Sequence, residues 1–345
     1  MQFVFFDTET TSTNATFGQM LEFSAIVCDE SLNETRGSLS VQSRLRPHII
    51  PELGALLVTN KTIEELKSRE TSHYQMVMEV LKFSKSVTPS TWIGWNTIEF
   101  DFKWLRQAFY QCLHQPYFHQ FYGNKRADAL PIARTSHLVN KTLFKVPNNK
   151  KGKPSFKLEA LAKANSIEHT EAHTALSDVG ATIGVSKMIL ERCPEIWKLA
   201  LQTTSKEETE ELIWGHPLFI ASESTFGTTK ARVMTAVCQH PIYKWPMAMD
   251  LKICPSTYLT LNTEELKNAI RKSPKLLRTV QTGNHPIILP TDYKQQIPEY
   301  NKIEVNTLLE RAKKIQRSSD LKERIENILV NEVMKRGGDH FLTQD

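Results

Sequence analysis

Residues 3–10 read FVFFDTET, and this stretch decides the fold. The apolar run at residues 3–6 predicts a buried strand. Asp7 and Glu9 follow two positions apart, so on an extended chain their side chains point to the same face. Neighbouring carboxylates repel each other unless a cation lies between them, and such hard oxygen ligands suit Mg²⁺ or Mn²⁺. The stretch indicates a strand that ends in a metal site, and two solvated acids are an equally open interpretation.

A second carboxylate signal is NTIEFD at residues 96–101, where a short apolar strand gives way to a helix. Asp101 lies near the start of that helix, where a negative charge is favoured in any case. Capping of the helix is therefore the simpler interpretation of Asp101 taken alone. Glu99 is a rival carboxylate in the same segment.

The third signal is EAHTALSD at residues 171–178, at the beginning of a long helical pattern. Asp178 falls in the first turns of that helix, and His173 lies five residues earlier. A histidine at such a position is often an ordinary loop residue. His169 and His173, with Glu171 between them, also leave open a transition-metal site formed by chance spacing.

Composition places the chain among ordinary globular proteins. It has 345 residues, 40% of them hydrophobic and 23% charged, which favours two or three domains. We expect no transmembrane helix and no signal peptide. The five cysteines are widely spaced without a CxxC pair, which indicates reduced thiols and a cytoplasmic protein.

The net charge of +5 is concentrated in one segment. Residues 129–158 contain one arginine and six lysines but no acid, and Lys150, Lys151 and Lys153 are its centre. Such a segment is a candidate contact for a polyanion. On charge alone, a solvated lysine-rich loop is the more probable interpretation.

Hydrophobic periodicity predicts an α/β layer structure over about the first 200 residues. Strands are expected at residues 3–6, 21–27, 38–45 and 91–96. Helices are expected at residues 62–66, 74–83, 102–113, 127–139, 156–165 and 175–193, with a loop at 146–155. A polar segment at 203–211 indicates a boundary, short apolar runs then predict a small β domain at 205–290, and residues 291–345 form a helical segment.

Taken together, D-x-E, N-x-x-x-F-D and H-x4-D form an ordered set that resembles the DEDD exonucleases of the RNase H-like fold, in the subgroup that uses histidine. KPSFKLEALAKANSIEHTEAHTALSDVGATI at residues 153–183 resembles the corresponding segment of the bacterial exonuclease I family. The resemblance extends to about residue 335. Thr11 and Ser12 depart from the glycine common in relatives, and the C-terminal helical region is shorter than the family leads us to expect.

The resemblance implies roles for individual residues. His173 would be the general base, and Asp7, Glu9 and Asp178 would bind two Mg²⁺ ions, which Mn²⁺ can replace. Asp101 would complete the acidic quartet. The residues that would contact substrate are Glu9, Thr10, Asn96, Phe100, Lys150, Lys151 and Lys153. Stacking also suits Phe102 and Trp104, although core packing is the better interpretation for at least two of these three aromatic residues.

The activity that the resemblance implies is metal-dependent 3′→5′ hydrolysis of single-stranded DNA to nucleoside 5′-monophosphates, in DNA repair or recombination. It further implies an exonuclease domain at residues 1–200, an SH3-like β domain at 205–290 and a monomer. The acidic tail of single-stranded-DNA-binding protein would dock on Arg311, Lys313, Lys314 and Arg317. An exoribonuclease, a proofreading-type nuclease, a single-strand-binding module without catalysis and a structural partner in a repair complex remain alternatives.

Overall fold

The computed structural model describes residues 2–169, 174–225 and 228–341. The chain divides into two compact units. The first comprises residues 1–204 with 224–228, and the second comprises residues 205–223 with 229–345. No described helix is long and apolar enough to cross a bilayer.

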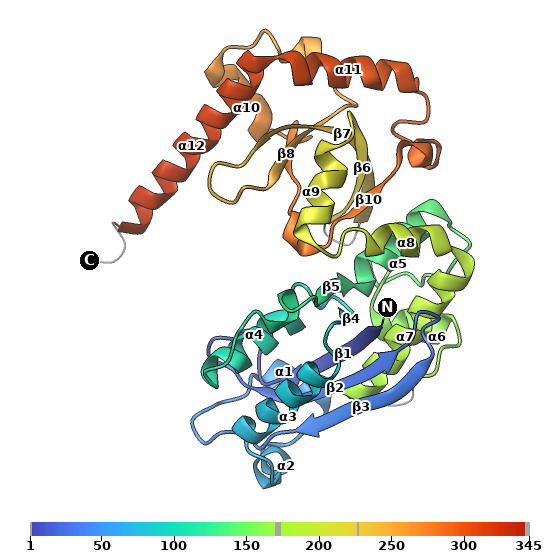
Figure 1. The fold of residues 1–345 in the computed structure, drawn as a ribbon, viewed down its shortest axis with the longest axis vertical. Helices are drawn as coiled ribbons and strands as arrows, with labels where there is room; N and C mark the ends of the chain where they lie inside the picture. The colour runs from blue at the N-terminus through green and yellow to red at the C-terminus, as the bar shows by residue number, and fades with distance from the viewer. Residues whose placement is uncertain (1, 170–173, 226–227, 342–345) are drawn as a thin grey trace. The chain divides into compact units, whose positions relative to one another are not determined.

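A five-stranded mixed sheet forms the centre of the first unit, in the order β3-β2-β1-β4-β5 (Figure 1). Its first three strands are antiparallel, and β4 and β5 continue the sheet in parallel with β1. The strands are β1 (Phe3–Thr10), β2 (Met20–Cys28), β3 (Glu34–Gln42), β4 (Thr91–Gly94) and β5 (Lys125–Asp128). This mixed sheet with helices on both faces is the α/β architecture that the sequence predicts.

Helices cover the sheet of the first unit. The long helix α7 packs on β1 and β2, and α3 and α4 pack on the same central strands from the other face. The helices of this unit are α1 (Leu53–Thr59), α2 (Ile63–Ser68), α3 (His73–Ser86), α4 (Asp101–Gln111), η1 (Phe118–Gln120), α5 (Ala129–Val139), α6 (Leu158–Ala164), α7 (Ala175–Arg192) and α8 (Pro194–Leu201).

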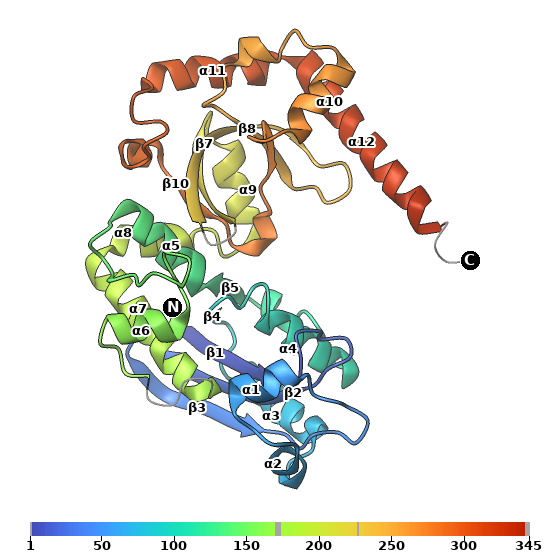
Figure 2. The same cartoon turned by 180° about the vertical axis from the view of Figure 1, so that it is seen from behind.

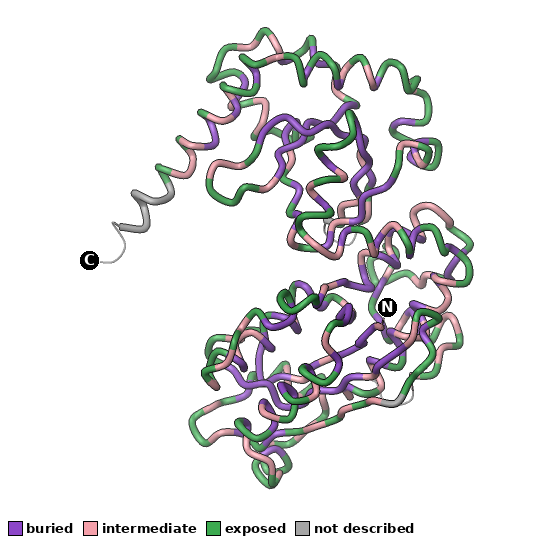
Figure 3. Tube along the Cα trace, in the orientation of Figure 1, coloured by how far each residue is buried: buried purple, intermediate pink, exposed green. Residues whose placement is uncertain are grey.

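The alternation of β1 explains how one strand serves both the core and a site. Val4 and Phe6 point into a buried cluster with α3 and α4, where Phe6 meets Phe102 edge-to-face at 5.0 Å. Side chains at odd positions face the other layer, where Phe3 packs against Trp197 at 5.8 Å. Buried residues follow the strands in Figure 3. The apolar first half of β1 therefore anchors the strand and fixes the direction of Asp7 and Glu9.

The second unit contains its own five-stranded sheet, in the order β10-β6-β7-β8-β9, seen from both sides in Figures 1 and 2. Its strands are β6 (Phe219–Thr225), β7 (Thr228–Gln239), β8 (Pro246–Asp250), β9 (Leu277–Thr279) and β10 (Ile287–Leu289). Its helices are α9 (Lys206–Trp214), η2 (Pro255–Thr257), α10 (Thr263–Arg271), η3 (Thr282–Asn284), η4 (Thr291–Gln296), α11 (Val305–Arg317) and α12 (Ser319–Phe341). Most of the short apolar runs form strands, as the sequence predicts, but the run YLTL at residues 258–261 lies in turns.

Three local differences from the expected elements have clear causes. The helix expected at 127–139 begins only at Ala129, because residues up to Asp128 pair with β4 and the Asp128 carboxylate caps the helix. The polar segment at 203–211 is largely helical, because Ser205 caps α9 through Glu208 N at 3.2 Å. Helix α1 was not expected, and none of its residues is buried.

Buried His119 gives the fold a pH dependence. Its ring lies among Phe6, Trp92 and Phe109, and its Nε2 atom makes no hydrogen bond to a described residue. Burial, reinforced by the charge of Arg126, lowers the pKa of His119 to about 3. His119 of the unfolded chain therefore binds a proton near pH 6.5, whereas His119 of the folded chain stays neutral at that pH.

We expect His119→Phe to become increasingly stabilising as the pH falls from 6.5 toward 3. The stability that neutral His119 contributes is complete above its unfolded pKa and is lost as the pH falls, by about 1.4 kcal/mol per pH unit. Subtracting the unfolding free energies of variant and wild type across this range isolates His119, since the acidic groups titrate in both proteins. A difference that stays constant with pH would contradict the assignment.

Candidate active site

Three carboxylates meet where β1 ends and α7 begins. Asp7 and Glu9 occupy alternate positions of β1, and Asp178 lies in the first turn of α7. One carboxylate oxygen from each residue lies within 4.8 Å of the other two. Oxygen ligands at this separation suit a hard divalent cation. The pair predicted to share a face of β1 therefore gains its third member from a segment 169 residues further along the chain.

The electrostatics of this cluster favour a cation. Removal from water raises the pKa of Asp7 well above its usual value, and the charges of Asp101 and Asp178 raise it further. Burial likewise raises the pKa of Glu9 to about 8, reinforced by Asp178 and opposed by Lys61. Acids held together at this cost in repulsion are typical of a site that a metal neutralises.

Asp101 belongs to the same acidic group but is held differently. Its Oδ1 atom accepts hydrogen bonds from Thr8 N at 3.0 Å and from Thr8 Oγ1 at 2.6 Å. Burial raises its pKa to about 7, although the bonds from Thr8 favour the charged form. Asp101 is the first residue of α4 and does not cap it, because the cap position is Phe100. The simpler interpretation, a capping aspartate, is therefore wrong.

The turn that carries Asp101 is fastened by Asp128, a residue that the sequence did not single out. Asp128 is buried, and its carboxylate accepts from Asn96 N at 2.9 Å, Ile98 N at 3.1 Å and Leu130 N at 3.0 Å. Asn96 adopts a left-handed backbone with φ of 64°, which asparagine tolerates. Asp128 thus joins the turn at 96–98 to the start of α5. Its only signal in the sequence is its place at the start of the helix predicted at residues 127–139.

We expect Asp128→Ala to destabilise the protein. The change leaves three backbone N–H groups without their acceptor, at about 1–3 kcal/mol for each buried group. Asp128→Asn keeps one acceptor oxygen and should lie between alanine and wild type. Denaturant unfolding of the three proteins tests this order. Equal stability of Asp128→Ala and wild type would show that the turn is held by other contacts.

A pocket of about 430 Å³ opens beside the carboxylates. Thr10, Asn96 and Phe100 line it, as their predicted contact with substrate requires. By contrast, Phe102 and Trp104 are buried in the core, as their spacing indicated. Another part of the lining comes from α1, where Gly54, Ala55 and Val58 border the pocket. The apolar run LGALLV at residues 53–58 could have suggested this exposed wall, because the sequence offers no core segment against which the run would pack.

His173 lies outside the described residues, together with Glu171. The structure does describe His169, whose Nε2 atom lies 2.5 Å from Asp178 Oδ1. The His169 side chain is only 5% exposed. His169 therefore supports Asp178 directly, and the role of His173 as general base stays a prediction.

The lysine-rich segment forms an exposed turn. Residues 148 and 154 pair across it, and Asn149 Oδ1 accepts from Lys151 N and Lys153 N. Lys150, Lys151 and Lys153 are exposed, and none of them lines the pocket beside the carboxylates. Their contact with a polyanion stays a prediction.

Comparison with known proteins agrees with this geometry. Residues 4–186 match the Exonuclease family. Exodeoxyribonuclease I of Escherichia coli K12 is 30% identical over 213 residues, which cover 61% of this chain and 44% of that protein. The chain thus matches less than half the length of this relative.

Solved structures extend the likeness over nearly the whole chain. Exonuclease I from Methylocaldum szegediense superposes with a TM-score of 0.82 at 26% identity, covering 95% of this chain and 73% of that one. A zinc-bound complex of E. coli exonuclease I with single-stranded DNA gives 0.80 at 23% identity, with the same two coverages. The carboxylates on β1 and α7, the RNase H-like mixed sheet and the match over residues 4–186 lead to one conclusion: this chain belongs to the Exonuclease family.

Proposed function

We propose that the chain is a metal-dependent 3′→5′ exonuclease that hydrolyses single-stranded DNA to nucleoside 5′-monophosphates. The observation that carries the proposal is the convergence of Asp7, Glu9 and Asp178, whose oxygens lie within 4.8 Å of one another. The similarity to exodeoxyribonuclease I supports DNA as the substrate.

The residues present fit a pair of divalent ions. Three acids with like charge, two of them with raised pKa values, form a donor set made only of oxygen. Asp7, Glu9 and Asp178 would hold Mg²⁺, with Mn²⁺ able to replace it. When bound, such ions activate water and stabilise the leaving oxygen of a phosphodiester.

The remaining residues of the site position the attacking water and accept its proton. Asp101, fixed by Thr8, adds a fourth carboxylate beside Asp7 and can orient a water molecule. His173 accepts the proton of the attacking water, a task for which an imidazole titrating near neutral pH is suited. His169 keeps Asp178 directed at the cluster.

The pocket beside the cluster accepts the terminal nucleotide. Phe100 offers an aromatic face, and stacking on a base is worth roughly 1–3 kcal/mol whatever the sequence. Thr10 and Asn96 provide polar groups on the same pocket, and α1 supplies the apolar wall. This combination would permit hydrolysis without sequence preference, because no part of it depends on one particular base.

The rest of the chain would guide the DNA strand toward the carboxylates. The five-stranded sheet of the second unit would be the SH3-like module, and the helices α11 and α12 follow it in the chain. Lys150, Lys151 and Lys153 would contact phosphates. The acidic tail of single-stranded-DNA-binding protein remains an expected partner for α11, where Lys314 and Arg317 lie in the last turn.

The test is a 5′-labelled single-stranded DNA incubated with purified protein, with Mg²⁺ and separately with EDTA. Matched duplex DNA and RNA are run beside it. A ladder that shortens from the 3′ end, only with Mg²⁺ and mainly on single-stranded DNA, is the expected result. A ladder mainly on RNA would favour an exoribonuclease, and binding without any ladder would favour a single-strand-binding module.

A further inference from the structure

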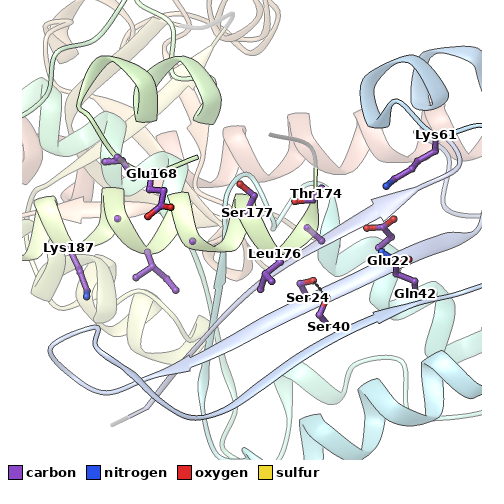
Figure 4. Close-up of a pocket in the computed structure, with 15 residues that line it drawn as sticks. Glu22, Ser24, Ser40, Gln42, Lys61, Glu168, Thr174, Leu176, Ser177 and Lys187 are labelled. Carbon is purple, nitrogen blue, oxygen red and sulfur yellow. Dashed lines mark hydrogen bonds between the residues drawn. The ribbon is translucent and has the colours of Figure 1, made fainter. Parts of the chain in front are cut away.

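A second cavity, of about 740 Å³, lies between α7 and the strands β2 and β3. We call it the β2–β3 pocket. Figure 4 shows Glu22, Ser24, Ser40 and Gln42 on its floor and the side chains of α7 above them. Its volume is in the range of pockets that bind small molecules. None of the proposed steps of hydrolysis uses it.

The floor of the β2–β3 pocket continues the face of the sheet that carries the catalytic acids. Directly opposed residues of antiparallel strands point to the same face. Glu9 opposes Glu22, which in turn opposes Gln42. Likewise, Asp7 opposes Ser24, and the Ser24 hydroxyl lies 2.9 Å from that of Ser40. Two rows of polar side chains therefore run from the carboxylate cluster into the pocket.

Lys61 gives one end of this pocket a positive charge, which also acts on the neighbouring Glu9. It lines the pocket, and its side chain extends toward Glu22 in Figure 4. Glu22 already has a cation, since Arg69 Nη2 lies 2.5 Å from its carboxylate and both side chains are largely buried. The Lys61 ammonium makes no ion pair or hydrogen bond with another described residue. An anion arriving there would meet a lysine whose ammonium is not held in an ion pair, although its charge also acts on Glu9.

The other walls of the pocket suit the remainder of a nucleotide. At the far end the pocket is lined by one lysine, Lys187, and one acid, Glu168. Their formal charges cancel, so that end carries little net charge. Leu176, Ile183 and Ile167 provide an apolar side on which a base can lie. Thr174 adds a hydroxyl group toward the Lys61 end, and Ser177 adds one between the two ends.

We propose that the β2–β3 pocket is a second nucleotide site that adjoins the carboxylate cluster, with Lys61 as its phosphate ligand. The inference rests on the proposed exonuclease function for the source of the nucleotide. That source is either the released nucleoside 5′-monophosphate or a phosphodiester of the bound strand. Both present the same phosphate chemistry to Lys61, and the tests below distinguish them.

The first test replaces Lys61 with methionine and measures dAMP binding by calorimetry in EDTA. We expect the dissociation constant of dAMP to rise about tenfold or more, because a charge-assisted hydrogen bond is lost. Deoxyadenosine, which has no phosphate, should bind both proteins equally. Lys67→Met removes the same charge from a nearby exposed position on α2 and should change neither value.

The second test fills the pocket from α7. A Cβ atom built on Gly180 meets nothing within 4 Å, and Gly180 lines the pocket. Gly180→Leu should therefore abolish dAMP binding while leaving the thermal unfolding temperature equal or higher, because leucine favours helix more than glycine does. Unchanged folding separates loss of the site from loss of structure.

Kinetics with Mg²⁺ then identify the source of the phosphate. Weaker product inhibition by dAMP in Lys61→Met indicates the released nucleotide, and a higher KM for an oligonucleotide indicates the strand. The proposal fails if both variants stay within about twofold of wild type in every one of these values, or if Lys67→Met matches Lys61→Met. Calorimetry does not need hydrolysis, so a wild-type protein without activity would refute the function and leave the pocket testable.

Discussion

Under the proposed function, Asp7→Asn should lower the rate of hydrolysis of single-stranded DNA on the order of 10³-fold or more. Asp7 lies at the centre of the acidic group. The neutral amide of the asparagine that replaces it is a poor ligand for Mg²⁺. Charge stabilisation by a bound metal is worth several kcal/mol, and each 1.36 kcal/mol is tenfold in rate. Initial rates on a 5′-labelled oligonucleotide measure the loss. Near-normal turnover would refute the assignment of Asp7 as a metal ligand.

The same variant should be more stable than wild type in EDTA at neutral pH. A carboxyl group whose folded pKa is raised stabilises the fold only below its unfolded pKa, and it opposes folding once it ionises. Asparagine removes that charge, so the melting temperature should rise. Mn²⁺ should raise the melting temperature of wild type alone. Glu99→Gln is the matched control, since Glu99 is exposed and paired with Lys103 at 2.9 Å.

His173→Gln should lower kcat by about 10²–10⁴-fold, the usual contribution of a general base. Because a base acts only when it is neutral, kcat of wild type should fall on the acid side of its pH profile. The variant should lose this dependence. Its Mn²⁺ affinity, measured by calorimetry, should remain that of wild type, because glutamine removes the base and leaves the three clustered carboxylates in place.

His169→Gln provides the contrast, because the two histidines lie four residues apart. His169 contacts Asp178 at 2.5 Å, so its loss should weaken Mn²⁺ binding and leave the acid limb of the pH profile in place. A loss of about 10–100-fold in affinity is typical for a residue that orients a metal ligand. If His169→Gln, and not His173→Gln, removed the acid limb, His169 would be the base.

The pattern D-x-E could be recognised from the sequence because its meaning is local. The apolar run before Asp7 requires a strand, and a strand places Asp7 and Glu9 on one face whatever surrounds them. The position of Asp178 early in a helix could be predicted for the same reason, from helical periodicity and chain order. Asp128 could not be found in this way, because two of its three bonds come from a turn about thirty residues away.

The sequence by itself thus determined the α/β class, the strand that carries two acids and the order of the acidic motifs, because periods of 2 and 3.6 residues are properties of the backbone. Tertiary structure alone decided that Asp178 reaches Asp7 and that Thr8 holds Asp101. It also decided that Lys61 faces an open pocket. These contacts depend on how strands pair and how helices pack, and residues far apart in the chain contribute to each of them.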